Sequence, residues 1–203
     1  MMPIQDIKAY LPKYLSEENY NILLKELDSF PDNMDKRMYT NSLSNNVVYQ
    51  GDGYESFPFV NLMHLDYECK YRNGMVFSNT CDLAVENRRL YSSSIVYAPI
   101  LDLNKYVEQL KSKKIPEDRI LNHINDIRRQ KVSSALFLPS NSKIADSIVF
   151  FDRMMSIDNS FLSREKLNHK RLFSLSDYGF YLLLFKLSVH FSRIQEKVNR
   201  GHS

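Results

Sequence analysis

Two apolar runs rich in β-forming residues stand near the middle of the chain, at residues 74–77 and 95–100. Neither run alternates polar with apolar positions, which is typical of strands that are covered in a closed or layered sheet. The connector between them opens with the polar segment 78–82, Ser-Asn-Thr-Cys-Asp. Because this segment follows directly on a strand end, its side chains are placed where a scaffold can present them to a ligand.

Other short apolar runs predict the remaining strands of the sheet. Each run is bounded by Asn, Asp, Ser, Gly or Pro, the residues that favour turns. The predicted strands are 47–49, 57–65, 135–138, 147–151 and 154–157, with a turn at 51–53.

Apolar residues at helical spacing predict helices on both sides of these strands and an inserted pair between them. Residues 4–11 and 16–29 are predicted to be helical, and a polar linker follows at 31–46. Two amphipathic stripes within 102–131 predict a helical hairpin. Ser176 is a good N-cap for a last helix, which is apolar nearly all round in its first half.

These elements predict an α+β protein in three parts. The expected parts are a helical N-terminal arm and linker (1–46), a β unit with the hairpin insertion (47–162) and a C-terminal helical extension (163–203).

Composition narrows the class of protein without identifying a partner. The 203 residues carry 27 basic and 24 acidic side chains, so only a local patch of charge would attract a nucleic acid. The two cysteines and five histidines show no metal-ligand spacing, and no Gly-rich phosphate loop is present. The chain has neither a signal-type start nor an apolar run of membrane-spanning length. We therefore expect a cytoplasmic protein with reduced thiols, no metal, no cofactor and no membrane partner.

Three motifs in order resemble the PemK/MazF family of toxin endoribonucleases. Arg72 stands six residues before Ser78, and a polar loop then leads to Val-Tyr-Ala-Pro-Ile at 96–100. Residues 145–162 are similar to a later strand and turn of that family, and Asn61-Leu62 with Glu68 to its first strand and flexible loop. The resemblance implies a small antiparallel SH3-like barrel, here with helical additions, and a homodimer.

The resemblance also implies where RNA cleavage would take place. Arg72 matches the family's motif arginine, and Ser78 ends the same strand. Two departures are Asn73 in place of a proline and Leu101 in place of a threonine that carries a hydroxyl. Metal-independent cleavage needs a group that activates the ribose 2′-hydroxyl and a cation near the phosphate.

The polar segment 78–82 offers two substitutes for the missing hydroxyl. Asp82 is a candidate general base, with Arg72 as phosphate clamp, and Cys81 is a candidate nucleophile without a histidine nearby in sequence. A turn-forming aspartate and a half-buried cysteine are the alternative interpretations of these two residues.

Cations and tyrosines on both sides of the first run suggest a track for single-stranded RNA. The charged segment 66–74 is predicted to be a loop, and the candidate RNA-binding residues are Lys70, Tyr71, Arg88 and Arg89. Solvated loop charges are the alternative interpretation.

Two functional classes therefore remain open. One is a toxin-related protein that acts on RNA, with metal-independent endoribonuclease activity. The other is a catalytically inactive barrel that binds nucleic acid or a protein, such as an antitoxin or a defence-system protein.

Overall fold

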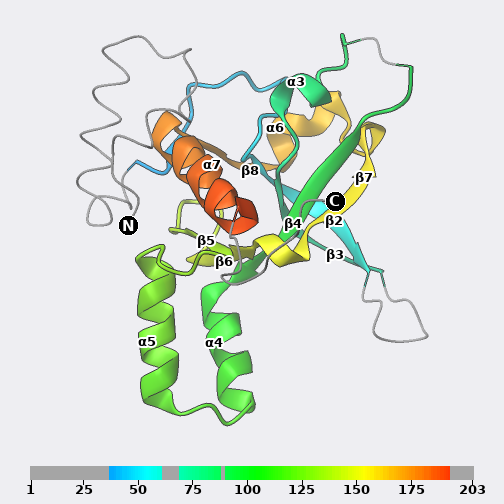
Figure 1. Cartoon of the computed structure of the whole chain (residues 1–203). Helices are drawn as coiled ribbons and strands as arrows, with labels where there is room; N and C mark the ends of the chain where they lie inside the picture. Colours follow the sequence, from blue (N-terminus) through cyan, green and yellow to red (C-terminus); the bar gives the residue numbers. More distant parts are fainter. Residues whose placement is uncertain (1–36, 61–68, 88–89, 193–203) are drawn as a thin grey trace, which may run out of the picture.

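The computed structural model describes residues 37–60, 69–87 and 90–192, which form an antiparallel eight-strand sheet with helices around it (Figure 1). The strand order is β1-β8-β2-β3-β4-β6-β5, and β7 also pairs with β4. The α+β class expected from the sequence is confirmed. The strands are β1 (Tyr39–Thr40), β2 (Gly53–Val60), β3 (Cys69–Val76), β4 (Ser94–Asp102), β5 (Ala135–Leu138), β6 (Ser147–Phe150), β7 (Met155–Asp158) and β8 (Arg171–Leu175).

β4 is the strand around which the sheet is built. It pairs with β3 at residues 97–99, with β7 at 94–97 and with β6 at 100–102. Residues 97–100 are all buried, which explains why this run is apolar without alternation. The predicted strand at 95–100 is therefore confirmed, and so is the predicted strand at 135–138.

β3 corrects the loop predicted at 66–74, because Cys69–Val76 is strand throughout. Its outer half is polar and exposed, so it lacks the apolar pattern that indicates a strand. The strand predicted at 57–65 begins earlier, at Gly53, and the predicted strand 47–49 is wrong because these residues are irregular and lead into a turn at 49–52. In that turn the backbone N–H groups of Tyr49 and Asp52 donate to the Asp52 carboxylate and the Tyr49 carbonyl, respectively.

Two strands were not expected from the sequence. β8 lies inside the region predicted to be a helical extension, and β1 lies inside the predicted linker. Since β8 pairs with both β1 and β2, the sheet extends beyond both ends of the predicted 47–162 unit. The apolar pattern does not indicate β8, because this strand carries the polar residues Arg171 and Ser174, both of which are buried.

A buried ionic cluster explains how an arginine fits into this strand. The Arg171 Nε lies 3.3 Å from a carboxylate oxygen of Asp52, which is 0% exposed, and donates to the Tyr54 hydroxyl at 3.0 Å. The same guanidinium donates to the carbonyls of Ser44 and Val47. The cluster thus ties β8 to β2 and holds the turn that precedes β2.

The predicted helical hairpin is confirmed as α4 (Leu103–Ser112) and α5 (Glu117–Arg128), which project together from the sheet (Figure 1). The Asp102 carboxylate caps α4 by accepting from the N–H groups of Asn104 and Lys105. Pro116 is the N-cap residue directly before α5, and Glu117 and Asp118 occupy the first turn.

The last helix is α7 (Asp177–Ser192), and the predicted N-cap is confirmed because the Gly179 N–H donates to Ser176 Oγ at 3.1 Å. Shorter helical turns are α3 (Thr80–Leu83), η2 (Phe151–Arg153), η3 (Asn159–Phe161), η4 (Arg164–Lys166) and α6 (Leu167–Lys170). The predicted helices at 4–11 and 16–29 lie outside the described residues.

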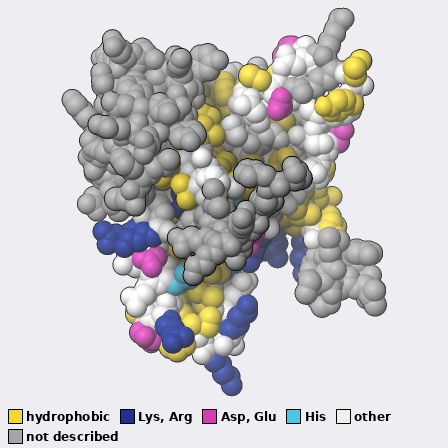
Figure 2. Space-filling view, in the orientation of Figure 1, with side chains coloured by type: hydrophobic (Ala, Val, Ile, Leu, Met, Phe, Trp, Pro, Cys, Tyr) yellow, Lys and Arg dark blue, Asp and Glu magenta, His cyan; other side chains and the backbone are white. Residues whose placement is uncertain are grey.

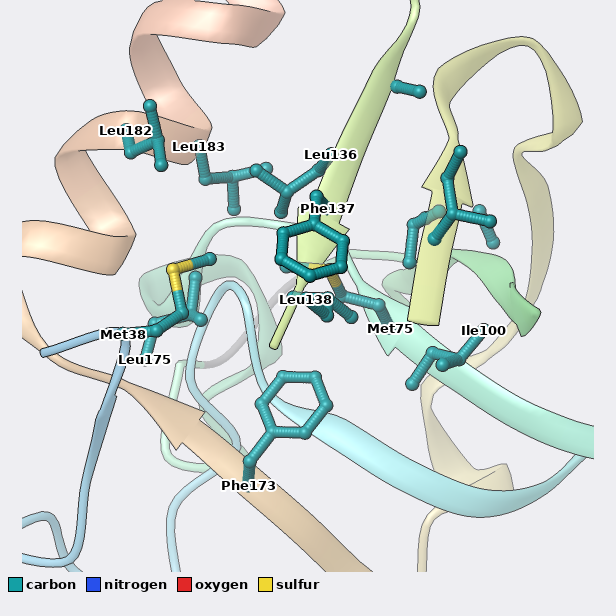
Figure 3. Close-up of a cluster of buried hydrophobic side chains, with 14 of the residues drawn as sticks. Met38, Met75, Ile100, Leu136, Phe137, Leu138, Phe173, Leu175, Leu182 and Leu183 are labelled. Atoms are coloured by element: carbon teal, nitrogen blue, oxygen red, sulfur yellow. The ribbon is translucent and has the colours of Figure 1, made fainter. Parts of the chain in front are cut away.

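The buried apolar side chains form two clusters. The larger lies between the sheet, α7 and the base of the hairpin, with Leu136 of β5 next to Leu183 of α7, and Met38 next to Leu175 (Figure 3). The smaller contains Phe57, Tyr97 and Leu167. Leu182 and Leu183 of α7 belong to this larger cluster, whereas Phe185 and Phe191 of the same helix remain exposed.

Candidate nucleic-acid interface

The outer parts of β2 and β3 form a two-stranded ribbon, residues 57–60 and 69–73, which we call the outer ribbon (Figure 1). β4 pairs with β3 only at residues 74–76, and β8 pairs with β2 only at residues 53–54. Within the described residues the outer ribbon therefore has no third strand. One face of the outer ribbon is covered where Phe57, which is 0% exposed, stacks on Tyr97 and Phe161, whereas Lys70, Tyr71 and Arg72 of β3 are exposed.

Register decides which side chains share a face of the outer ribbon. Arg72 pairs with Phe57 and Lys70 pairs with Phe59, so both cations lie on the face that carries these two phenylalanines. Tyr71 pairs with Pro58 and points to the opposite face, where it is 66% exposed. The structure thus brings Lys70 and Arg72 onto one face but places Tyr71 on the other.

Aromatic rings support the face that carries the cations. The Phe57 and Tyr97 rings stack at 4.3 Å, and the half-buried Phe59 ring meets Tyr97 edge-on at 5.2 Å. The Tyr97 hydroxyl donates to the carbonyl of Pro58, and burial raises the pKa of Tyr97. Phe59 is the residue that the sequence reasoning missed. Its only signal was its period-2 spacing from Phe57, which required the correct strand boundaries.

Ser78 lies just beyond the other end of β3, where its hydroxyl forms hydrogen bonds with the backbone of β4. Its hydroxyl accepts from the Val96 N–H at 2.7 Å and donates to the Ser94 carbonyl at 3.0 Å. These bonds extend the pairing of β3 with β4 by one side chain. Both roles of the hydroxyl are therefore occupied within the fold.

Cys81 and Asp82 follow in α3, which Asn79 caps by accepting from the Cys81 N–H at 2.9 Å. Both side chains are exposed. Asp82 lies in the first turn of this helix, where a carboxylate is favoured.

Strand geometry separates the two halves of the predicted catalytic group. Six extended residues from Arg72 to Ser78 span about 20 Å. Arg72 and Lys70 therefore lie at one end of β3, whereas Ser78, Cys81 and Asp82 lie at the other. Within one chain, a phosphate bound at Arg72 is too far from Asp82 for both groups to contact it.

The remaining predicted residues are placed only in part. Arg88 and Arg89 lie outside the described residues, so the predicted RNA track is not placed as a whole. Leu101, at the position of the family's threonine, pairs with Ile148 in the sheet. Its neighbour Asp102 is used as the cap of α4.

A cavity of about 590 Å³ lies between β1, the turn before β2 and the start of α7, and sequence reasoning did not anticipate it. Thr80 of the polar segment 78–82 reaches its wall, but Thr80 Oγ1 already accepts from the Gln50 N–H at 3.0 Å. Ser176 Oγ in the same wall donates to the Arg37 carbonyl. The wall is lined by Arg37, Tyr39, Thr40, Ser42, Leu43, Tyr49, Gln50, Thr80, Leu175, Ser176, Asp177, Tyr178 and Phe180.

The described residues offer no feature typical of a metal centre or of a membrane span. No three His, Cys, Asp or Glu side chains in this part of the chain are grouped so as to hold a metal ion. None of its helices has both the length and the apolar character needed to cross a membrane.

Comparison with models of known protein families gives no match, and comparison with curated protein sequences gives none either. The function is therefore argued from the site itself.

Proposed function

We propose that the chain is a PemK/MazF-like, toxin-related protein that binds single-stranded RNA on the cationic face of its outer ribbon. The observation that carries the proposal is the pairing of Lys70 with Phe59 and of Arg72 with Phe57 on one face. Cations contact the phosphates of a single strand, and the exposed part of the half-buried Phe59 ring can stack on an unpaired base. Lys70 and Arg72 lie about 7 Å apart along the strand, so each can contact a different phosphate of the same RNA strand.

The proposal includes a barrel of the SH3-like type. The two strands at the ends of the sheet order, β1 and β5, approach each other, since the Tyr39 hydroxyl donates to the Pro139 carbonyl at 2.7 Å. Met38 and Leu138 belong to the same buried cluster. These contacts support a sheet that curls towards closure around the larger core.

Binding is favoured over cleavage by the positions of the candidate catalytic groups. Arg72 and Asp82 lie at opposite ends of β3, and the Ser78 hydroxyl is occupied by β4. A phosphate clamp without a base beside it holds RNA but does not activate the 2′-hydroxyl. We therefore propose that the protein binds RNA without cleaving it. The test below would also detect endoribonuclease activity.

The test is fluorescence anisotropy of a labelled 12-nucleotide single-stranded RNA of mixed sequence. The double variant K70E/R72E should weaken binding at least about tenfold and reduce the salt slope of the affinity by about 1 to 2, because two phosphate contacts are lost. Phe59→Ala should weaken binding by about 1 kcal/mol or more with little change in the salt slope, because stacking is not screened.

The matched control is K113E/K114E, which changes the charge equally at the exposed turn of the hairpin. It should leave most of the RNA affinity in place. Equal losses in both double variants, or binding indifferent to salt, would refute the proposed site. Gel analysis of the same RNA after incubation decides between the functions: cleavage by the wild type that Arg72→Ala abolishes would establish the endoribonuclease instead.

A further inference from the structure

The hairpin α4–α5 carries an apolar groove on the part that projects from the sheet (Figure 1). In the described part of the chain α4 packs on α5 and β4, and α5 packs on β5. Leu103 and Ile127 are buried by these contacts, but Leu121 remains 64% exposed. The groove encloses about 290 Å³ and is lined by Val107, Lys111, Glu117, Ile120, Leu121, Ile124, Asn125 and Arg128.

The groove lies between α4 and α5, and its outer side is open because neither of the two helices covers it. Side chains three and four residues apart form ridges on the helix surface, and a further helix packs into the groove between such ridges. Ile120, Leu121 and Ile124 follow this spacing along α5. The shape of the groove is thus suited to one more helix, which would complete a three-helix bundle.

The hairpin also carries a net positive charge. Residues 103–131 hold eight basic and four acidic side chains, a net charge of +4, whereas the other 174 residues together have a net charge of −1. Figure 2 shows Lys and Arg side chains beside hydrophobic ones on this lower part of the molecule. Arg128 at the groove pairs with Asp146 at 2.6 Å, while Lys111 lines the groove from α4.

We propose that this groove binds an amphipathic α-helix of a partner protein, with an apolar face and acidic flanks. The 12 residues of α5 span about 18 Å. A partner helix of about 12 residues matches this length and presents apolar residues at i, i+3, i+4 and i+7. RNA would also be drawn by the positive charge, but it would leave the apolar groove, with Leu121, without an apolar partner.

The test uses three labelled synthetic helical peptides that share one apolar face and differ in their flanks, which are Glu, Gln or Lys. Fluorescence anisotropy with the full chain should rank them Glu, Gln, Lys, with about tenfold or more between the first and the last, because potentials at an interface must be complementary. Leu121→Glu should weaken the Glu-flanked peptide by about tenfold or more, because it removes apolar burial and adds a like charge.

Neighbouring residues provide matched controls. Asn122→Glu adds the same charge at an exposed position of α5 that does not line the groove, and should change affinity by less than about twofold. Lys111→Glu should abolish the preference for Glu over Lys flanks, whereas Lys105→Glu on the exposed surface of α4 should not. Circular dichroism of each variant confirms that the hairpin is intact.

Five outcomes would overturn the proposal. They are equal affinity for the three peptides, no affinity tighter than about 100 μM, and displacement of the peptide by single-stranded RNA that itself depends on Leu121. A mass near twice 23.9 kDa that Leu121→Glu reduces would mean that a second copy fills the groove. A gain of about tenfold in peptide affinity on substituting Leu23 and Leu27 by Glu would mean that the chain's own residues 16–29 compete for it.

Discussion

The buried side chain of Lys186 allows us to predict how the free energy of unfolding changes with pH. This lysine of α7 is only 4% exposed, and its Nζ donates to the carbonyls of Gln130 and Val132 at 2.8 and 2.9 Å. Burial lowers its pKa from 10.5 to about 7. The two carbonyls stand just beyond the end of α5, so the lysine fastens the hairpin to α7 while remaining neutral above pH 7.

The sign of the effect follows from proton binding. Between pH 7 and 10.5 the unfolded chain holds a proton on Lys186 that the folded chain does not. Stability must therefore rise with pH in this window and fall as pH decreases towards 7. Each pKa unit corresponds to about 1.4 kcal/mol, and because both titrations are incomplete at the ends of the window, the rise from pH 7.5 to 9.5 is about 2.5 kcal/mol.

The assay is urea denaturation followed by circular dichroism at pH 7.5, 8.5 and 9.5. The wild type should gain stability along this series, and Lys186→Met should remove most of the slope. Lys105→Met, at an exposed position of α4, should keep it. Lys186→Met also removes the hydrogen bonds to two carbonyls. That loss lowers the stability by the same amount at each pH and does not contribute to the change in slope. A wild-type stability that is flat or falls with pH, or an unchanged slope in Lys186→Met, would refute the reasoning.

Two further predictions concern the sheet. Gly74→Ala would place a Cβ 2.5 Å from the fully buried Phe57 ring, so the same denaturation assay should show a loss of about 1–3 kcal/mol. Asn73→Ala, one residue away on the opposite face, should cost clearly less, and equal losses would contradict the assigned register. Arg171→Met should cost about 3–5 kcal/mol by leaving the Asp52 carboxylate buried without its partner. Adding Asp52→Asn should recover part of that loss, and simple additivity of the two substitutions would contradict the coupling.

The sequence predicted those strands and helices whose burial is apolar. β4, β5 and the hairpin were found because every buried position in them is occupied by an apolar side chain or lies on an amphipathic stripe. β8 was missed because it buries Arg171, and only the distant Asp52 makes that burial tolerable. Local pattern does not reveal a polar group whose partner lies more than a hundred residues away.

The candidate site was predictable in its residues but not in its geometry. The sequence pattern indicates a loop around Lys70 and Arg72, whereas the structure places both on one face of a strand. A register shift between Tyr54 and Phe57 in β2 decides which residues oppose them. Because a change of one residue in register exchanges the two faces, neither the contribution of Phe59 nor the separation of Tyr71 follows from spacing alone.

The spacing from Arg72 to Ser78 has a structural explanation that does not require a reaction. Gly74 allows the Phe57 ring to lie against the strand, Val76 pairs with Tyr97, and Ser78 then fastens the strand end to β4 through two hydrogen bonds. A six-residue interval is therefore the length of strand needed to cross from the outer ribbon to the centre of the sheet. A resemblance based on this interval supports a related sheet more strongly than a related chemistry. The reaction would depend on which charged groups meet at one end of that strand, and at the Arg72 end they are cations beside aromatic rings.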